Sequence, residues 1–589
     1  MTAAKAPTPK RVLLAKWLAQ HVPLLDHVKN QALAELLGDV VAGSITAILI
    51  IPQAIAYALL AGLPPQMGLY AAIIAPVVYA ITGSSRATII GPAAVTSAMV
   101  ATALVPLASG GPAAQVAGAV LIGIISGTVL LLMGLIRMGW LTHFISNPVL
   151  SGFTTGAVIY IVIGQFATLL GIHAPKNVLP LDTLRSLIHA ISTINPITAA
   201  CGVGAVILLL LAKGCSAKLG KMLGFSENVG TQLGRIAPLF VVLIFTVLSS
   251  VYSLSIAHSV DVVGEIPRGL PQFSLKMPAD VDWRPLLPDA VLIAIIGYIE
   301  TLSVAKALAF RRRERISPDR ELVSLGLTNI AIAACGGMPV AGSFSKSMVN
   351  FESGARTQLS GLVAAVWVAI CAIFVTGLLQ QLPRAVLAAI IIVAVLRLID
   401  FKSALTTWRY DRGDGLAQIA TIIGVLALGI DLGLLAGSFL ALALFLYRTS
   451  RPHILVVGHV PGTQHFRSIK RNDVVTFDHL LLIRIDENLY FANTPRVETE
   501  LQRLVAEYPN AVDVVLILSG IGYIDASSLD MLDNFERELS RAGCRLHLSE
   551  FKSQVIDRLR PTEFFQRLFP ERIHRSTFEL VASFDAGMF

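Results

Sequence analysis

Charged residues are absent from three long stretches near the start of this sequence. No Asp, Glu, Lys or Arg occurs in residues 40–85, 87–136 or 138–175. About 20 apolar residues cross the hydrocarbon core of a bilayer as a helix, so each stretch has room for more than one crossing. Only 14% of the 589 residues are charged and 54% are hydrophobic, whereas an average soluble protein has about 25% charged residues. The chain is therefore predicted to be a polytopic α-helical membrane protein.

Apolar blocks punctuated by Gly and Pro divide the first three quarters of the chain into fourteen segments. The expected segments are 40–60, 66–82, 93–107, 113–135, 148–170, 197–213, 236–256, 287–309, 318–335, 344–351, 359–380, 384–399, 414–430 and 432–448. An even number of crossings predicts that both ends of the bundle lie on one side of the membrane.

The basic residues indicate which side that is. They follow the even-numbered segments, at Lys213, Lys218, Lys221, Arg311, Arg312, Arg313, Arg315, Lys402, Arg409, Arg412, Arg448 and Arg451. The opposite loops at 62–65 and 106–112 have no charge. Because Lys and Arg accumulate in cytoplasmic loops, both termini are predicted to be cytoplasmic, and the expected location is a bacterial inner membrane.

After Arg451 the composition becomes that of a soluble domain. Strands are expected at 480–485, 488–491, 512–518 and 545–549, and helices at 495–507, 527–541 and 553–559. Alternating strands and helices predict a small parallel or mixed sheet with helices packed on it. The expected division is an N-terminal segment at 1–38, a membrane domain at 39–448 and a cytoplasmic α/β domain at 449–589.

Several function classes lack sequence support. The basic residues lie in loops between apolar segments, which disfavours nucleic-acid binding despite the net charge of +8. His143, His173 and His258 lie near segment ends and have no second ligand at metal spacing. No Walker loop is present in the sequence. The five cysteines are interpreted as small core residues; they are Cys201, Cys215, Cys335, Cys371 and Cys544. No catalytic residue, metal site or cofactor is predicted, and the chain is not expected to be an enzyme.

Two interrupted segments stand third in each half of the bundle. The first contains Gly91-Pro92-Ala93-Ala94, and the second contains Gly336-Gly337-Met338-Pro339 followed by Gly342-Ser343-Phe344-Ser345-Lys346. Paired segments of this kind predict inverted repeats whose half-helices meet near the middle of the membrane. Because a helix N-terminus leaves N–H groups unpaired and has partial positive charge, two that face each other favour an anion.

Lys346 adds a full positive charge near the start of the second half-helix, beside the hydroxyl groups of Ser343, Ser345 and Ser347. The alternative is a lysine that extends to the membrane interface. The neighbouring hydroxyls favour the anion site.

Glu300 lies alone between Asp289 and Lys306 in an apolar segment. A carboxylate at this depth costs on the order of 2.5–3.5 kcal/mol, so it should face the protein interior. It is interpreted as a proton carrier, because burial favours the neutral acid. A sodium ligand and a structural partner of Lys346 are the alternatives. Its counterpart in the first half is Gln53, which follows Pro52.

At these residues the chain resembles the SulP family of anion transporters, related to the mammalian solute carrier family twenty-six. The matching motifs are Ile51-Pro52-Gln53-Ala54-Ile55-Ala56-Tyr57-Ala58, Ala61-Gly62-Leu63-Pro64-Pro65, Gly83-Ser84-Ser85-Arg86, Gly91-Pro92, Asn147-Pro148-Val149-Leu150, Gly326-Leu327-Thr328-Asn329 and Gly342-Ser343-Phe344-Ser345. The soluble tail, with Ile524-Asp525-Ala526-Ser527-Ser528-Leu529, resembles a STAS domain.

The resemblance implies seven-plus-seven inverted repeats with a core and a gate domain, a cytoplasmic STAS domain, a homodimer in membrane lipid and an elevator-like movement of the core. The implied substrate pocket consists of Gln53, Tyr57, Ala93, Ala94, Ser343, Phe344, Ser345 and Lys346, with Glu300 as the proton-coupling residue. Ser527 falls where phosphorylated relatives of the STAS domain have their serine. A helix N-cap is the favoured role for it here.

Departures from the family pattern bear on the substrate. Relatives often have Arg at the position of Lys346, and an ammonium cannot bind an oxyanion in the bidentate manner of a guanidinium. Sodium-dependent bicarbonate transporters tend to have Thr at the position of Val304, so its absence argues against sodium. Proton-coupled sulfate uptake is the favoured function, with a bicarbonate or dicarboxylate transporter as the alternative.

Two other classes stay open. A nucleobase–cation symporter would share the bundle but normally lacks a STAS tail. An anion channel, exchanger or membrane sensor would use the STAS domain to bind regulators.

Overall fold

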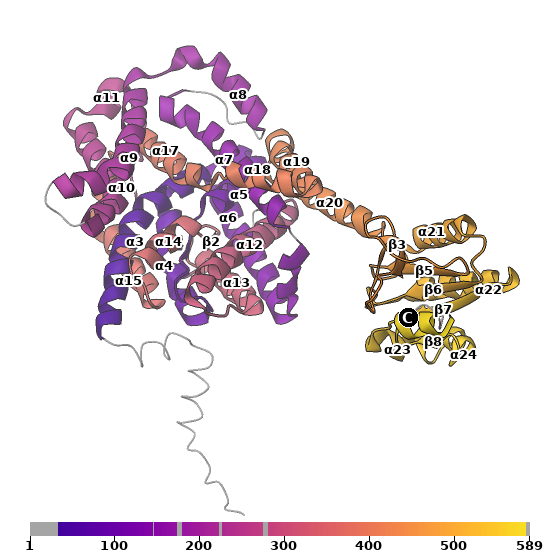
Figure 1. Ribbon diagram of the computed structural model, residues 1–589. Helices are drawn as coiled ribbons and strands as arrows, with labels where there is room; N and C mark the ends of the chain where they lie inside the picture. Colours follow the sequence, from indigo (N-terminus) through magenta and orange to yellow (C-terminus); the bar gives the residue numbers. More distant parts are fainter. Residues whose placement is uncertain (1–32, 145, 173–178, 223–226, 275–280, 585–589) are drawn as a thin grey trace, which may run out of the picture. The chain divides into compact units, whose positions relative to one another are not determined.

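The computed structural model describes residues 33–144, 146–172, 179–222, 227–274 and 281–584. The chain divides into two compact units, Met1–Leu440 and Ala441–Phe589. The first is helical and the second contains a β-sheet (Figure 1). Most of the predicted N-terminal segment at 1–38 lies outside the described residues.

Each of the fourteen expected segments coincides with helical structure. The corresponding elements are α3 (Leu33–Leu60), α4 (Pro65–Thr82), α5 (Ala94–Ala103), α6 (Gly111–Leu135), α7 (Asn147–Leu170), α9 (Pro196–Met222), α10 (Glu227–Val251), α12 (Leu287–Arg312), α13 (Pro318–Ala334), α14 (Phe344–Glu352), α15 (Leu359–Ile370) continued by a π-turn and α16 (Thr376–Leu379), α17 (Arg384–Val395), α19 (Arg412–Leu428) and α20 (Ile430–Thr449). Three short helices were not expected: α8 (Pro180–His189), α11 (Leu254–His258) and α18 (Phe401–Tyr410).

Helix length separates complete crossings from partial ones. In the described part of the chain, seven helical stretches are long and apolar enough to cross a membrane. By contrast, α5 has 10 residues and α14 has 9, so at about 1.5 Å per residue each is about half as long as a bilayer core is thick. The count of fourteen complete crossings stays a prediction.

The order of elements around the two short helices is repeated. Helices α3 and α4 precede strand β1 (Ile90–Gly91) and α5, and helices α12 and α13 precede strand β2 (Ala341–Gly342) and α14. The halves pack on each other, with α6 against α13 and α3 against α15. β2 lies between α14 and α12 in Figure 1. Because the repeats are intertwined, the two short helices begin close together.

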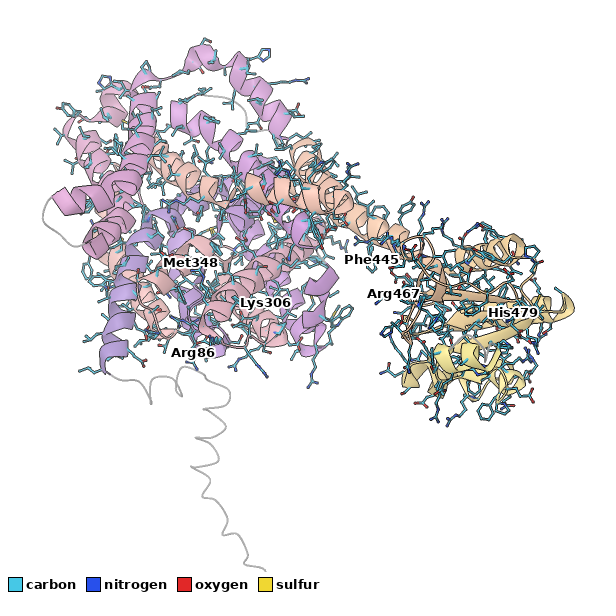
Figure 2. The ribbon with its side chains drawn as sticks, viewed as in Figure 1. Arg86, Lys306, Met348, Phe445, Arg467 and His479 are labelled. Carbon is cyan, nitrogen blue, oxygen red and sulfur yellow. The ribbon has the colours of Figure 1, made fainter. Side chains whose placement is uncertain are left out.

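An apolar cluster joins α12 to α14 beyond the start of α14. Val304 and Leu308 of α12 pack with Ala87, Met348 and Phe351. Of these residues, Met348 is labelled in Figure 2. Val304 is 3% exposed. The side chain of Val304 therefore faces hydrocarbon groups.

The second unit is a six-stranded sheet in the order β4-β3-β5-β6-β7-β8. Its elements are β3 (Ile454–His459), β4 (Phe466–Ser468), β5 (Leu480–Ile485), α21 (Thr494–Glu507), β6 (Asp513–Ile517), α22 (Ala526–Arg541), β7 (Arg545–Ser549), α23 (Ser553–Leu559), α24 (Glu563–Leu568), β8 (Ile573–His574) and α25 (Thr577–Phe584). Strands β5 to β8 are parallel, and β3 is antiparallel to both β4 and β5.

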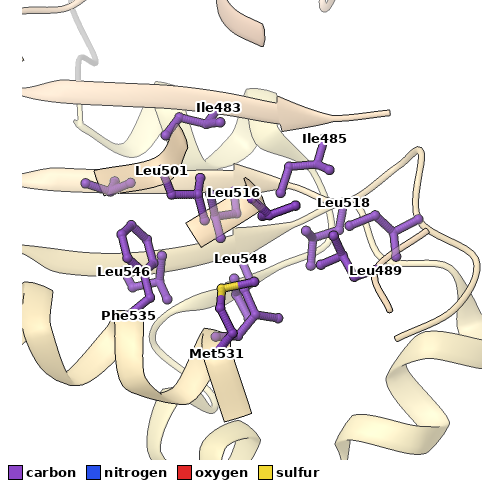
Figure 3. Close-up of a cluster of buried hydrophobic side chains, with 14 of the residues drawn as sticks. Ile483, Ile485, Leu489, Leu501, Leu516, Leu518, Met531, Phe535, Leu546 and Leu548 are labelled. Carbon is purple, nitrogen blue, oxygen red and sulfur yellow. The ribbon is translucent and has the colours of Figure 1, made fainter. Parts of the chain in front are cut away.

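Alternating side chains give this sheet two apolar faces. Ile483 and Ile485 belong to the cluster that contains the helix residues Met531 and Phe535 (Figure 3). Leu480 and Leu482 belong to a second cluster with residues of α25. Both faces are covered, as parallel sheets require.

The strand expected at 488–491 is not present. Leu489 makes an isolated bridge with Ile524, while the side chain of Asn493 donates to the carbonyl of Asn488, and the side chain of Asn488 accepts from the N–H of Gly522. These asparagine bonds satisfy the backbone in a turn, which competes with strand formation.

Candidate functional site

The two short helices start from a crossing of the two short strands. Ile90 pairs with Gly342, and Gly91 pairs with Ala341, in antiparallel orientation. Helix α5 begins three residues after β1, and α14 begins two residues after β2. Neither helix has a side-chain N-cap. The first N–H groups of both helices are thus available to an anion.

Lys346 joins the two helix starts. Its side chain is fully buried in the first turn of α14, and its ammonium donates to the carbonyl of Pro92, just before α5. A Cβ at Gly91 would lie 3.7 Å from Nζ of Lys346. A positive charge at a helix N-terminus is unfavourable by itself. This excess of positive potential favours a bound anion.

The first-half residues of the expected pocket come from α3 and the start of α5. Gln53 and Tyr57 lie on α3 and are 2% and 4% exposed. The ring centre of Tyr57 is 5.4 Å from Nζ of Lys346, a cation–π contact. Ala93 is the N-cap residue of α5 and Ala94 its first residue. Their small side chains leave the helix N–H groups uncovered.

The second-half residues lie at the start of α14. Ser343 is its N-cap residue, followed by Phe344 and Ser345. Phe344 is 42% exposed, in contrast to the buried Ser343. Ser347, which sequence reasoning grouped with the possible oxyanion donors, instead accepts a 2.9 Å hydrogen bond from the N–H of Ile89. Its hydroxyl thereby holds α14 against the segment that leads into β1.

Glu300 projects from α12 beside this arrangement. Its Oε2 is buried and has no hydrogen-bond partner among the described residues. Glu300 and Lys346 form no direct ion pair in the described part of the chain, but their charges interact through space. The alternative interpretation of Glu300 as a structural partner of Lys346 therefore stays a prediction.

Two further hydroxyl groups at this site were missed by sequence reasoning. Thr96 and Ser97 in the first turns of α5 are at most 1% exposed, and their side-chain oxygens lack partners among the described residues. The side-chain oxygen of Gln53 is in the same state. Buried polar atoms are normally paired, so these groups are suited to a ligand or to ordered water. Their position three and four residues after Ala93, in the first turns of an expected half-helix, could have indicated in the sequence that they belong to the site.

Ser527 lies at the surface of the second unit, in the first turn of α22. It is not the N-cap. Asp525 has that position, and its carboxylate accepts a 2.9 Å hydrogen bond from the N–H of Ser528. Asp525 takes the capping role because it directly precedes the first helical residue, Ala526, and has a charged acceptor, whereas Ser527 lies inside the helix.

Two family models and several curated relatives match this chain. The model of the sulfate permease family matches residues 36–421, and that of the STAS domain matches residues 471–579. The chain is 33% identical to sulfate transporter 4.1, chloroplastic, of Arabidopsis thaliana over 586 residues, which cover 95% of this chain and 83% of the relative. It is 32% identical to a Mycobacterium tuberculosis protein named "Probable sulfate transporter MT1781", with 91% and 93% covered.

Solved structures share the fold. The murine solute carrier 26 family member A9 anion transporter in its inward-facing state superposes with a TM-score of 0.87 at 19% identity and covers 100% of this chain and 96% of its own. The transmembrane domain of a cyanobacterial bicarbonate transporter, BicA, gives a TM-score of 0.58 at 25% identity over 69% of this chain and 98% of its own. The helical bundle and the α/β tail together form this fold.

Proposed function

Because this chain belongs to the sulfate permease family and has a STAS domain, we propose that it is a secondary active transporter that takes up an inorganic oxyanion, sulfate, together with protons. The observation that supports this proposal most strongly is the buried ammonium of Lys346 between two uncapped helix starts. Relatives named as sulfate transporters supply the choice of anion.

The proposed binding site combines one full charge with neutral donors. Lys346 and the N–H groups at the starts of α5 and α14 attract the oxyanion, while Gln53 and Ser345 provide polar side chains beside them. Tyr57 and Phe344 limit the space, and Ala93, Ala94 and Ser343 allow the anion to approach the backbone. Backbone N–H groups suit a tetrahedral oxyanion because they donate without requiring counter-charges.

Glu300 is the proposed proton carrier. A carboxylate beside the anion repels it, and protonation removes the repulsion, so the anion and the proton favour each other's binding. The apolar surroundings of Val304 supply no oxygen ligand for sodium at that turn. This favours protons as the coupling ion.

The packing of helices supports an elevator-type movement. The site residues lie on α3, α5, α12 and α14, which pack on one another and on α4, α6, α13 and α15. Helices α7, α9, α17 and α19 form a second group with their own contacts. An anion bound entirely within the first group would be carried with it when that core slides along the second group, the gate.

We place this multi-pass protein in a bacterial inner membrane with both termini in the cytoplasm, as a homodimer surrounded by lipid. The exposed Ser527 is a proposed phosphorylation site, because phosphate in the first turn of α22 would meet the positive end of the helix.

An uptake panel tests the function. Purified protein in liposomes is given labelled sulfate, bicarbonate or succinate, with and without an inward proton gradient. We expect saturable sulfate accumulation that the gradient drives uphill. A preference for bicarbonate or succinate would contradict sulfate as the substrate. Current without saturation would indicate a channel.

A further inference from the structure

Thr301 follows Glu300 in α12 and has a fully buried side chain. Its hydroxyl donates to the carbonyl of Gly297 over 2.6 Å and accepts from the N–H of Gly342 over 2.7 Å. Gly342 is the last residue of β2 and immediately precedes the N-cap of α14. One hydroxyl therefore connects the helix that bears Glu300 to the backbone from which the second half-helix starts.

The two elements meet without an intervening side chain at this point. A Cβ at Gly342 would lie only 2.8 Å from Cα of Thr301, closer than real Cβ contacts allow. One turn earlier, a Cβ at Gly297 would lie 3.4 Å from Cβ of Ala341. This close approach requires glycine at 342 and makes the distance between α12 and β2 sensitive to small changes.

The other polar contacts of α14 run elsewhere. Ser347 accepts from the N–H of Ile89, and Asn350 donates to the carbonyl of Ala87. Both fix α14 to the first half of the bundle. Towards the C-terminal end of α12, Val304 and Leu308 pack on Met348 through apolar contacts, which have no directional preference. The Thr301 hydrogen bond thus fixes a relation that these contacts leave free.

We infer that Thr301 is a positioning residue that holds Glu300 at a set distance from the proposed anion-binding N–H groups at the start of α14. The inference rests on the proposed function. Glu300 has a buried oxygen without a hydrogen-bond partner among the described residues, so its charge acts on the site through space, and a Coulomb interaction depends on the separation. Losing the hydroxyl would therefore weaken the link between the charge of Glu300 and anion binding.

The test measures sulfate dissociation constants of the full-length protein near pH 6 and pH 8. Thr301→Val keeps the shape of the side chain and removes the acceptor of the Gly342 N–H, whereas Thr301→Ser keeps the hydroxyl. Thr328→Val is the matched control, because the hydroxyl of this fully buried helical threonine bonds to Ser324 of its own helix over 2.7 Å. Bicarbonate and succinate are titrated in parallel.

We expect Thr301→Val to weaken anion binding near pH 6 by about 10-fold, because the start of α14 loses the bond that fixes it to α12. Near pH 8 the smaller repulsion from Glu300 offsets part of this loss, so the affinity ratio between the two pH values moves towards one. Thr301→Ser and Thr328→Val should both stay close to wild type. A purely structural role would reduce thermal stability in both valine variants without changing the pH ratio. Wild-type affinity and pH ratio in Thr301→Val, or equal weakening in both valine variants, would overturn the inference.

Failure of the proposed function has a different signature. A wild-type protein whose binding ignores pH would contradict proton coupling. A 10-fold affinity loss in Thr301→Val but not in Thr328→Val would then still show that the Thr301 hydroxyl positions the start of α14. Preference for another anion would change the substrate, and the same comparison holds with that anion. If Thr301→Val does not fold, Gly342→Ala displaces β2 from α12 and should act in the same direction; wild-type behaviour of that variant would contradict the positioning role.

Discussion

Lys346 combines three features that rarely coincide in one lysine. Its side chain is completely buried, it stands in the first turn of a helix, and its ammonium is bonded to the segment before another helix start. Both helix dipoles oppose a positive charge there. The energetic cost of this arrangement is explicable if an anion occupies the site during function.

Replacing Lys346 by Gln tests this explanation. We expect sulfate affinity to fall by about 10- to 100-fold, as for loss of a charge-assisted hydrogen bond. In the absence of sulfate, thermal stability should be unchanged or higher, because a buried charge is removed. Titration calorimetry and melting curves measure the two effects, and Lys402→Gln, at an exposed position of α18, is the control. Undiminished sulfate binding by Lys346→Gln would contradict the assignment.

The sequence predicted the charged members of the site because charges are scarce in its apolar segments. Glu300 and Lys346 stood out for that reason, and the resemblance implied Gln53 and Tyr57. The positioning roles of two hydroxyls were not predicted: Thr301 was not singled out, and Ser347 was grouped with the oxyanion donors. Their partners Gly342 and Ile89 lie 41 and 258 positions away in the sequence. Such contacts exist only after the two halves of the chain pack.

The crossing of β1 and β2 depends on side chains that bond to backbone. Ser347 holds the N–H of Ile89, and Asn350 and Gln358 donate to carbonyls of residues 85–88. Two-residue strands alone are too short to be stable. These bonds therefore determine where α5 starts relative to α14.

Ser347→Ala is expected to destabilise this crossing. The buried N–H of Ile89 would lose its acceptor, at a cost of about 1–3 kcal/mol, and thermal inactivation of sulfate binding should occur at lower temperature. Ser192→Ala, at an exposed position, serves as the control. Equal thermal inactivation of the two variants would show that the Ser347 bond is dispensable.

The parallel strands carry a chain of ionisable groups, in which Asp513 and His547 are buried and His574 is half-buried. Nε2 of His547 on β7 is 2.9 Å from Oδ1 of Asp513 on β6, and Nδ1 of His547 is 3.2 Å from Nε2 of His574 on β8. Burial lowers the pKa of His547 despite the bond to Asp513. Burial and the charge of His547 also lower the pKa of His574. Both imidazoles therefore bind a proton less readily in the folded domain than in the unfolded chain.

Acidification should loosen this part of the sheet. Unfolded histidine takes up a proton as the pH falls through about 6.5, while the folded domain resists protonation, so stability is lost as the pH falls. Hydrogen exchange of peptides from β7 and β8 should accelerate at low pH beyond the intrinsic rate. His574→Gln should reduce this pH dependence, and the exposed His465→Gln should leave it intact. A pH-independent protection in wild type would contradict the assignment.

Secondary structure was predicted best where patterning was strongest. Strands 480–485 and 545–549 and the helix at 553–559 match β5, β7 and α23. The hairpin strands β3 and β4 and the last elements α24, β8 and α25 were not foreseen. Strand β8 has two residues and pairs only with β7, so its existence depends on the completed sheet.

At the level of the whole molecule, scarce charge predicted the bundle and its fourteen segments. What it could not predict is which helices group together. The packing of α6 on α13 and of α3 on α15 joins segments from opposite halves of the chain. The order of segments along the sequence does not indicate which of them pack together. The site exists because this pairing brings two interrupted segments into contact.

Proton-coupled anion accumulation is the central claim, and Glu300→Gln tests it most directly. Gln removes the titratable group and keeps the size and polarity of the side chain. In liposomes with an inward proton gradient, wild type should accumulate labelled sulfate uphill, whereas Glu300→Gln should bind and exchange sulfate but equilibrate it only, with uptake independent of pH. Uphill accumulation by Glu300→Gln with wild-type pH dependence would contradict the account.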